Sequence, residues 1–337
     1  MASSVLRRVL FALCGLGLGA WAAIALLEAG SDAGPWRQIL AVAVAAVAIA
    51  STTMVLLRGP GWRALAAVVL PALAVAGWYA TLQPRNDRDW LPDVANTPWA
   101  EVVGDRITIH NVRNFAWRTE TDFTPRWETR TVDLAQLECV DLVASYWMGD
   151  AIAHIMVSFA FKDAPALAVS IETRKEVGEP YSTVLGFFRR YELVYVVADE
   201  RDLIGVRTNV RADPPEDVYL YRVAMPLEAA RRLLLEYIRQ MNELREHPRF
   251  YNTATTNCTT MVLVNNRVNG PVSLLNWKIL FSGYLPQLVH ERGRLDQSLP
   301  FAELRRRSRV NEAALAAGLE APDFSTRIRR GLPRPVR

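Results

Sequence analysis

Cys258 is the residue of this chain with the clearest chemical potential. A run of hydroxyl and amide side chains, residues 251–257, leads through it into an apolar segment. This pattern predicts that Cys258 lies in the first turn of a helix. There the first backbone N–H groups lack intrahelical acceptors and the helix dipole is positive, so a thiolate is favoured over a thiol. We therefore expect Cys258 to be a nucleophile.

A nucleophilic cysteine needs an imidazole that accepts its proton. The sequence offers four candidates, His110, His154, His247 and His290. The usual papain order, with the histidine after the cysteine, indicates His290, but His290 lies in a charged, helical-looking segment. His154 lies in an apolar strand, where a neutral imidazole is plausible. A lone histidine on such a strand is more often a structural core residue, so the spacing alone leaves both roles open for His154.

A predicted β-hairpin supplies the group that would orient His154. Its strands are residues 153–161 and 167–174, joined by a turn near Asp163. Antiparallel pairing about that turn sets His154 opposite about Thr173, which puts Glu172 or Arg174 beside the imidazole. We expect Glu172 to orient His154, although a slip of one residue would exchange the faces of the strand.

Other interpretations of Cys258 stay open. Cys14 lies in an apolar segment, which leaves Cys139 as a disulfide partner in a non-catalytic envelope scaffold. A metal site built from His154, Glu172 and a second histidine has no supporting spacing. The sequence also contains no G-x-x-x-x-G-K-[ST], G-x-G-x-x-G, G-x-S-x-G, H-E-x-x-H or C-x-x-C motif. We therefore expect neither a metal nor a cofactor.

Three apolar segments, residues 9–27, 39–57 and 64–82, precede the cysteine and histidine. None contains a charged residue, and each approaches the ~20 residues that cross a bilayer. We expect three transmembrane helices, the first being long for a signal peptide. The flanking arginines are Arg7, Arg8, Arg58 and Arg63. By the positive-inside rule they predict a multi-pass membrane protein with a cytoplasmic N-terminus and a C-terminal domain outside the cytoplasm. In a Gram-negative bacterium this corresponds to the inner membrane with the C-terminal domain in the periplasm.

The expected organisation is a transmembrane region at 1–83, a linker at 84–100, an extramembrane domain at 101–290 and a basic, partly helical tail at 291–337. The net charge of +4 does not indicate a nucleic-acid partner, because the excess lies beside the spans and in the tail. The tail arginines either contact anionic lipid headgroups or are simply solvated. The charged cluster of residues 199–202 and Arg207 is most simply a surface turn.

Strands precede helices in the extramembrane domain, so the fold class is α+β. A long amphipathic helix is expected to begin at Pro226 and to end near His247. The strand with His154, the strand with residues 170–174, and residues 250–252 leading to Asn257-Cys258-Thr259-Thr260 resemble the Lnb N-terminal periplasmic domain family. The resemblance implies a permuted papain-like or NlpC-like thiol peptidase fold, an antiparallel sheet packed on helices. In that permuted order the histidine strand precedes the cysteine helix, which favours His154 as the base.

The resemblance also implies an activity, since Lnb proteins are bacterial lipoprotein N-acyltransferases. Cys258 would take an acyl chain from a membrane phospholipid as a thioester, with His154 as the base, and a lipoprotein N-terminal amine would then accept it. The N–H groups of Cys258 and Thr259 would stabilise the oxyanion. The expected binding residues are Tyr251, Ser170, Arg174, Asn257 and Thr259.

The chain departs from the Lnb pattern in the order of its parts. In Lnb proteins the domain precedes membrane spans, whereas here three spans precede the domain. This departure weakens the expectation of a lipoprotein substrate more than the expectation of thiol chemistry. A cell-wall peptide amidase or peptidase of the same fold therefore stays open as an alternative activity.

Overall fold

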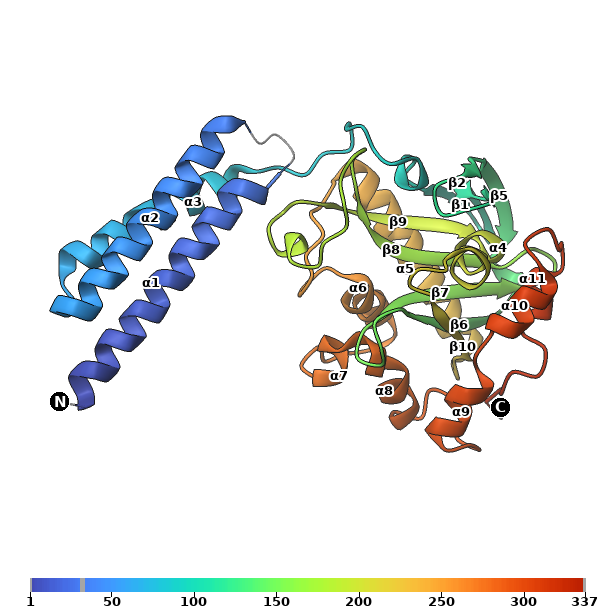
Figure 1. The fold of residues 1–337 in the computed structure, drawn as a ribbon. Helices are drawn as coiled ribbons and strands as arrows, with labels where there is room; N and C mark the ends of the chain where they lie inside the picture. Colours follow the sequence, from blue (N-terminus) through green and yellow to red (C-terminus); the bar gives the residue numbers. More distant parts are fainter. Residues whose placement is uncertain (1, 31–33, 336–337) are drawn as a thin grey trace. The chain divides into compact units, whose positions relative to one another are not determined.

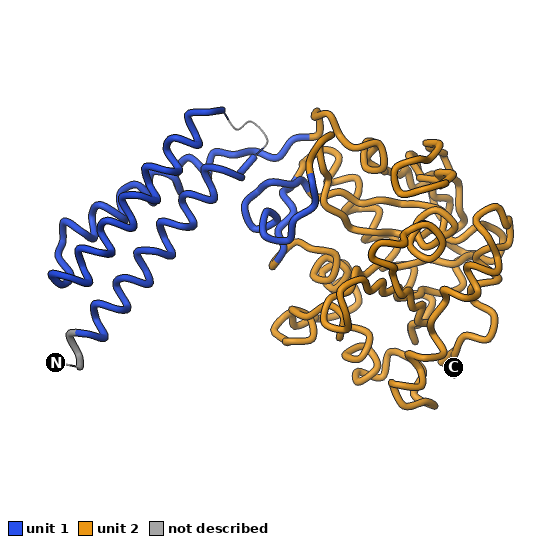
Figure 2. Tube along the Cα trace, in the orientation of Figure 1, with its two compact units in different colours: residues 1–85, 180–192, 249–253 blue, residues 86–179, 193–248, 254–337 orange. Residues whose placement is uncertain are grey.

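A computed structural model describes residues 2–30 and 34–335 and divides the chain into two compact units (Figure 1). Unit 1 contains residues 1–85, 180–192 and 249–253, and unit 2 contains residues 86–179, 193–248 and 254–337 (Figure 2). Two short segments from the second half of the chain, 180–192 and 249–253, thus belong with the N-terminal helices.

Unit 1 is built on three long helices, α1 (Ala2–Glu28), α2 (Pro35–Arg58) and α3 (Trp62–Thr81). As expected, each is long and apolar enough to cross a membrane. Helices α1 and α2 approach closely at Gly19, where an added Cβ atom would lie 2.3 Å from the Cβ of Ala48. Small residues therefore allow the close packing that is typical of membrane helices.

Unit 2 is α+β and contains a mixed β-sheet in the order β1-β2-β9-β8-β7-β6-β10, with β5 paired to β2. The strands are β1 (Trp99–Val103), β2 (Arg106–Arg113), β5 (Trp127–Asp133), β6 (Leu137–Tyr146), β7 (Ala153–Phe161), β8 (Leu167–Arg174), β9 (Glu192–Asp199) and β10 (Asp217–Arg222). Strands β3 (Ala116–Trp117) and β4 (Phe123–Thr124) form a separate small sheet. The expected antiparallel sheet is wrong in one place, because β2 pairs in parallel with β9 at Arg113 and Ala198.

The helices of unit 2 fall mainly in its C-terminal half. They are α4 (Glu200–Leu203), α5 (Leu227–Glu246), α6 (Cys258–Asn265), α7 (Trp277–Leu280), α8 (Leu285–Glu291), α9 (Phe301–Arg307), α10 (Asn311–Ala317) and α11 (Phe324–Arg327), with one turn of π-helix at Val206–Val210. The predicted long helix is confirmed as α5, which begins directly after Pro226 and ends directly before His247.

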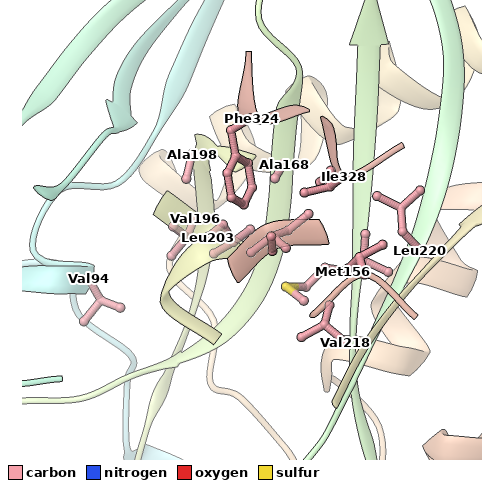
Figure 3. Close-up of a cluster of buried hydrophobic side chains, with 14 of the residues drawn as sticks. Val94, Met156, Ala168, Val196, Ala198, Leu203, Val218, Leu220, Phe324 and Ile328 are labelled. Carbon is pink, nitrogen blue, oxygen red and sulfur yellow. The ribbon is translucent and has the colours of Figure 1, made fainter. Parts of the chain in front are cut away.

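Different helices cover the two faces of the sheet. Phe159 and Tyr195 face α5, where their rings lie 5.5 and 5.9 Å from the ring of Tyr237. Met156 is three residues from Phe159 in β7, and Val196 is one residue from Tyr195 in β9. Because side chains alternate along a strand, Met156 and Val196 point to the other face. They belong to a buried cluster with residues of α4, α10 and α11 (Figure 3).

The C-terminal segment is part of this core. Phe324 and Ile328, only 2% and 1% exposed, lie among the side chains of β7 and β9 (Figure 3). The next residue, Arg329, forms ion pairs with Glu200 and Asp141, neither of which is exposed. The expectation that the C-terminal arginines are solvated or lie on lipid headgroups is therefore wrong for Arg329.

The charged segment after β9 is not the surface turn that we expected. Glu200 and Asp202 are fully buried and Arg207 is 4% exposed. Asp202 accepts hydrogen bonds from Arg113 at both carboxylate oxygens, the shortest at 2.9 and 3.0 Å, while Glu200 pairs with Arg329. A buried charge is tolerated when it is paired and hydrogen-bonded. The partners here come from distant parts of the chain, which a local charge pattern does not reveal.

Candidate active site

Cys258 is the first residue of α6, as the sequence predicts. The side chain of Asn257 accepts the N–H of Thr260 at 2.8 Å, and the Thr260 hydroxyl accepts the N–H of Asn257 at 3.0 Å. This is a capping box, which fixes the start of the helix. The capping box uses the N–H groups of Asn257 and Thr260. The N–H groups of Cys258 and Thr259, also in the first turn, are therefore left to donate to another acceptor.

The Cys258 thiol meets His154 at the start of β7, and the two side chains are hydrogen-bonded. The ladder between β7 and β8 runs only as far as the pair Met156 and Ser170. Just before that point, the backbone N–H of Ile155 also donates to the Cys258 sulfur. The thiol therefore lies where the hairpin opens, and it remains partly exposed.

Glu172 and Ser170 hold the other side of the imidazole. Nε2 of His154 lies 3.1 Å from Oε1 of Glu172 and 2.5 Å from Oγ of Ser170. The Ser170 hydroxyl donates to Oε1 of Glu172 at 2.6 Å, so it accepts from Nε2–H of His154. This arrangement favours a proton on Nε2 and leaves Nδ1 for the thiol.

The predicted hairpin is confirmed, but its register differs by one residue from the expectation. Met156 pairs with Ser170 and Val157 with Val169. Continuing this register sets His154 opposite Glu172 rather than Thr173. The two side chains consequently lie on the same face of the sheet, which is the arrangement that an orienting carboxylate requires.

Arg207 supports Glu172 and was missed as a site residue. Its guanidinium donates to Oε1 of Glu172 at 3.1 Å and to the carbonyl of Leu203 at 2.7 Å. Its Nε lies 3.7 Å from Oε2 of Glu216, a carboxylate that also bonds to Ser145. The one sequence signal was that Glu172, on a buried strand, requires a cation somewhere in the fold.

The electrostatics of the site favour an ion pair between Cys258 and His154. Burial lowers the pKa of His154, but the charges of Glu172 and Cys258 outweigh burial and raise the pKa to about 10. Burial raises the pKa of the Cys258 thiol, but His154 outweighs it and lowers the pKa below the ordinary value. Burial likewise raises the pKa of Glu172, yet His154 and Arg207 hold it well below the usual range. Thiolate, imidazolium and carboxylate thus stabilise one another.

Two of the predicted binding residues, Arg174 and Tyr251, make contacts with other parts of the chain. Arg174 donates to the carbonyls of Val94 and Ala95, at 3.0 and 2.6 Å, and so fixes the segment before β1. Tyr251 belongs to unit 1, where its N–H donates to the carbonyl of Tyr191 at 2.9 Å. Ser170, Asn257 and Thr259 lie beside His154 or Cys258, and Oγ1 of Thr259 is 3.8 Å from Sγ.

The structure describes all four histidines, and His154 is the one that reaches Cys258. Nε2 of His290 lies 3.2 Å from the carbonyl oxygen of Leu299. His110 stacks on a tryptophan ring of β1 at 3.9 Å, and His247 caps the end of α5. Among residues 2–30 and 34–335, no group of three or more His, Cys, Asp or Glu side chains could hold a metal ion.

The disulfide alternative does not fit this geometry. Cys139 pairs with Ala160 in the ladder in which Ser145 pairs with His154. Ala160, the partner of Cys139, is six residues from His154 along β7, which is ~20 Å at the usual rise per residue of a strand. Cys139 is therefore far from the thiol beside His154, beyond the reach of a disulfide. The structure describes all three cysteines, and each is free.

Residues 123–284 match the family model of the Lnb N-terminal periplasmic domain. The matched segment contains Cys258, His154, Glu172 and Arg207, and the resemblance expected from the sequence is confirmed. No curated protein and no solved structure matches the chain. Together with the three apolar helices, the match indicates a membrane protein with a periplasmic domain.

Proposed function

We propose that the protein, whose residues 123–284 match the Lnb N-terminal periplasmic domain, is a membrane-tethered Cys–His acyltransferase acting on lipid acyl chains. The observation that carries the proposal is the hydrogen-bonded series from Cys258 through His154 to Glu172 and Arg207. A nucleophilic thiol requires an adjacent imidazole that a third group holds in one orientation, as Glu172 and Arg207 hold His154 here. A purely structural thiol does not require such an imidazole.

In the first step, the thiolate of Cys258 attacks the carbonyl carbon of a phospholipid ester. A bond forms between sulfur and carbon, and the N–H groups of Cys258 and Thr259 stabilise the oxyanion. The intermediate collapses with cleavage of the ester C–O bond, and the imidazolium of His154 gives its proton to the leaving oxygen. The products are an acyl thioester on Cys258 and a lysophospholipid.

In the second step, an amine attacks the thioester carbon. His154, now neutral, accepts the proton from the amine nitrogen, and the C–S bond breaks to restore the thiolate. The proposed acceptor is the free amine of a lipoprotein's N-terminal diacylglyceryl-cysteine. Glu172 and Arg207 keep the imidazole in place throughout both steps.

The proposal includes the permuted NlpC-like fold and a location in the bacterial inner membrane. The order of β7 before α6, with His154 preceding Cys258, supports the permuted fold. The arginines that flank the spans support a cytoplasmic N-terminus and a periplasmic unit 2. A tether of this kind keeps the thiol close to its lipid acyl donor.

The test uses the full chain in nanodiscs of phospholipid with an isotopically labelled acyl chain. Peptide mass spectrometry is expected to find a labelled thioester on Cys258, which a synthetic diacylglyceryl peptide with a free amine discharges. The variant Cys258→Ser should form none. Cleavage of cell-wall peptides without any thioester from phospholipid would instead support the peptidase alternative. Absence of both reactions would support a scaffold.

A further inference from the structure

Unit 1 contains a loop, residues 180–192, that is docked on the end of the helix bundle where α1 and α3 finish. Phe188 is 8% exposed and belongs to the apolar cluster that includes Ala22 and Leu26 of α1 and Val75 of α3. Ala22 and Val75 lie about 9 Å below the ends of their helices at the usual rise of 1.5 Å per residue. The docked phenylalanine thus packs into the bundle at the level of its last turns.

Two arginines of the loop bind carbonyls at or just beyond the ends of these helices. Nη1 of Arg189 donates to the carbonyls of Tyr79 and Leu82, at 2.8 and 3.3 Å. Nη1 of Arg190 donates to the carbonyl of Gly30 at 3.3 Å. The last carbonyls of a helix lack intrahelical donors and carry the negative end of the helix dipole, so guanidinium groups are favourable there. The loop is therefore fixed to the helix ends by both apolar and polar contacts.

The same loop exposes apolar side chains. Tyr181, Val184 and Phe187 are 52%, 58% and 44% exposed. The loop is closed on itself, because the Tyr191 hydroxyl accepts the N–H of Ser182 and donates to the carbonyl of Pro180. A single exposed apolar residue on a soluble surface means little. Here, however, three of them lie on a fixed loop beside the ends of helices that are apolar enough to span a bilayer.

We propose that residues 180–192 form an interfacial loop, and that Tyr181, Val184 and Phe187 contact bilayer phospholipid at the boundary between headgroups and acyl chains. The spans fix the depth of the helix ends in the bilayer, and Phe188 fixes the loop to those ends. Tyrosine and arginine are both favoured at this depth, where an apolar body and a polar group meet different surroundings.

The loop also connects the lipid surface to the chain that enters α6. Thr253, five residues before Cys258, donates its hydroxyl to the carbonyl of Thr183 at 2.8 Å and its N–H to the carbonyl of Gly186 at 3.3 Å. A residue at Gly186 with a Cβ atom would meet the Thr253 hydroxyl at 2.3 Å. The lipid contact goes beyond the proposed function and holds whether or not Cys258 is catalytic.

A photo-crosslinking experiment tests this proposal in the full chain in native membranes with radiolabelled phospholipid. The photoreactive residue p-benzoylphenylalanine replaces Val184 or, as a matched control, Leu315 of α10, since both side chains are 58% exposed. A third position, Leu73 on the exposed face of α3, is the positive control. We expect phospholipid adducts at 184 and 73 and a much lower yield at 315. Equal yields at 184 and 315, or adducts with protein alone at 184, would overturn the proposal.

Two further variants separate this surface from the chemistry of the thiol. In the Cys258→Ser background the adduct at 184 should form in undiminished yield, so a failure of acyl transfer and a failure of lipid contact are distinguished. Phe188→Asp should lower the yield at 184, because it removes the docking contact, while the yield at 73 shows that the spans are still inserted. An unchanged yield at 184 in Phe188→Asp would contradict the role of the docked phenylalanine.

Discussion

Two cysteines of unit 2 show how strongly the surroundings of a thiol decide its chemistry. Burial and the charge of Asp141 raise the pKa of Cys139 to about 12. Burial acts in the same direction at Cys258, but His154 reverses the effect and lowers the pKa. The difference arises because Cys258 is one member of an alternating series of charges, thiolate, imidazolium and carboxylate, in which each member stabilises the next.

This contrast predicts the pH dependence of alkylation. The rate at which iodoacetamide modifies Cys258 should rise with an inflection below the range of an ordinary thiol, because the lowered pKa provides thiolate at lower pH. His154→Ala should move the inflection to higher pH. Peptide mass spectrometry measures both cysteines in one sample, and Cys139 should react only under strongly alkaline conditions. An ordinary inflection for Cys258 in the wild type would contradict the ion pair.

Replacing Glu172 with glutamine tests the alkaline side of the same series. Because the pKa of His154 is raised to about 10, the imidazolium persists above the ordinary histidine pKa. Its charge is lost as the pH rises through about 10. Glu172→Gln removes the charge that raises this pKa, so the loss should occur at lower pH. Ser170→Ala keeps the charge and should shift the profile less. The NMR chemical shifts of the His154 imidazole as a function of pH measure both variants, and equal shifts of the titration midpoint would contradict the role of the carboxylate.

At the scale of elements, the start of α6 positions the thiol through its capping box. Asn257→Ala removes the side chain that accepts the N–H of Thr260 and should destabilise the first turn by ~1 kcal/mol. Hydrogen exchange of the amides at 258–261 should then be about fivefold faster. Asn257→Asp retains the acceptor and is the matched control. Identical exchange in Asn257→Ala and the wild type would show that the cap contributes nothing.

The elements that could be predicted from the sequence are those with a strong local pattern. Alternating residues around a polar turn predict β7 and β8 with the bounds that the structure has. Pro226 and the His247-Pro248 pair bracket α5 in the same way. Local patterns reduce the candidate bases to four histidines and place Glu172 near His154, and the resemblance to the Lnb family then favours His154 as the base. The register could not be predicted, because a slip of one residue leaves the local pattern unchanged.

The contacts that could not be predicted join distant segments. Arg207 meets Glu172 across 35 positions of the chain, and Arg329 meets Glu200 across 129. In sequence, the charges at 199–207 look like a solvated turn, since nothing local indicates their partners. The docking of Phe188 on the ends of the spans was unpredicted for the same reason.

At the scale of the whole molecule, the C-terminal segment stabilises unit 2 through Arg329. Arg329→Met would leave the buried Glu200 without its cation and Asp141 with Arg222 as its remaining ion-pair partner, and it should destabilise the protein by about 3–5 kcal/mol. Arg306→Ala breaks an exposed pair with Glu303 and should cause no measurable change. Thermal unfolding of the solubilised full chain compares the two variants. Equal melting temperatures would contradict a structural role for the C-terminal segment.

The chain passes between the two units five times, not once. The loop at 180–192 and the segment at 249–253 both contribute to unit 1, and the second of these leads directly into α6. The linker after α3 is thus one of several connections between them. A truncated chain without residues 1–85 would lose the partners of Phe188 and Arg189, so experiments on the thiol require the full chain.

The central claim, that His154 activates Cys258, is tested most directly with an activity-based thiol probe on the full chain at neutral pH. We predict that the probe labels the wild type and His290→Ala equally, and that it does not label Cys258→Ser. Labelling of His154→Ala should fall by at least about tenfold, the effect of raising the thiol pKa by one unit. Equal labelling of the wild type and His154→Ala would contradict the account, and a loss confined to His290→Ala would assign the base to His290.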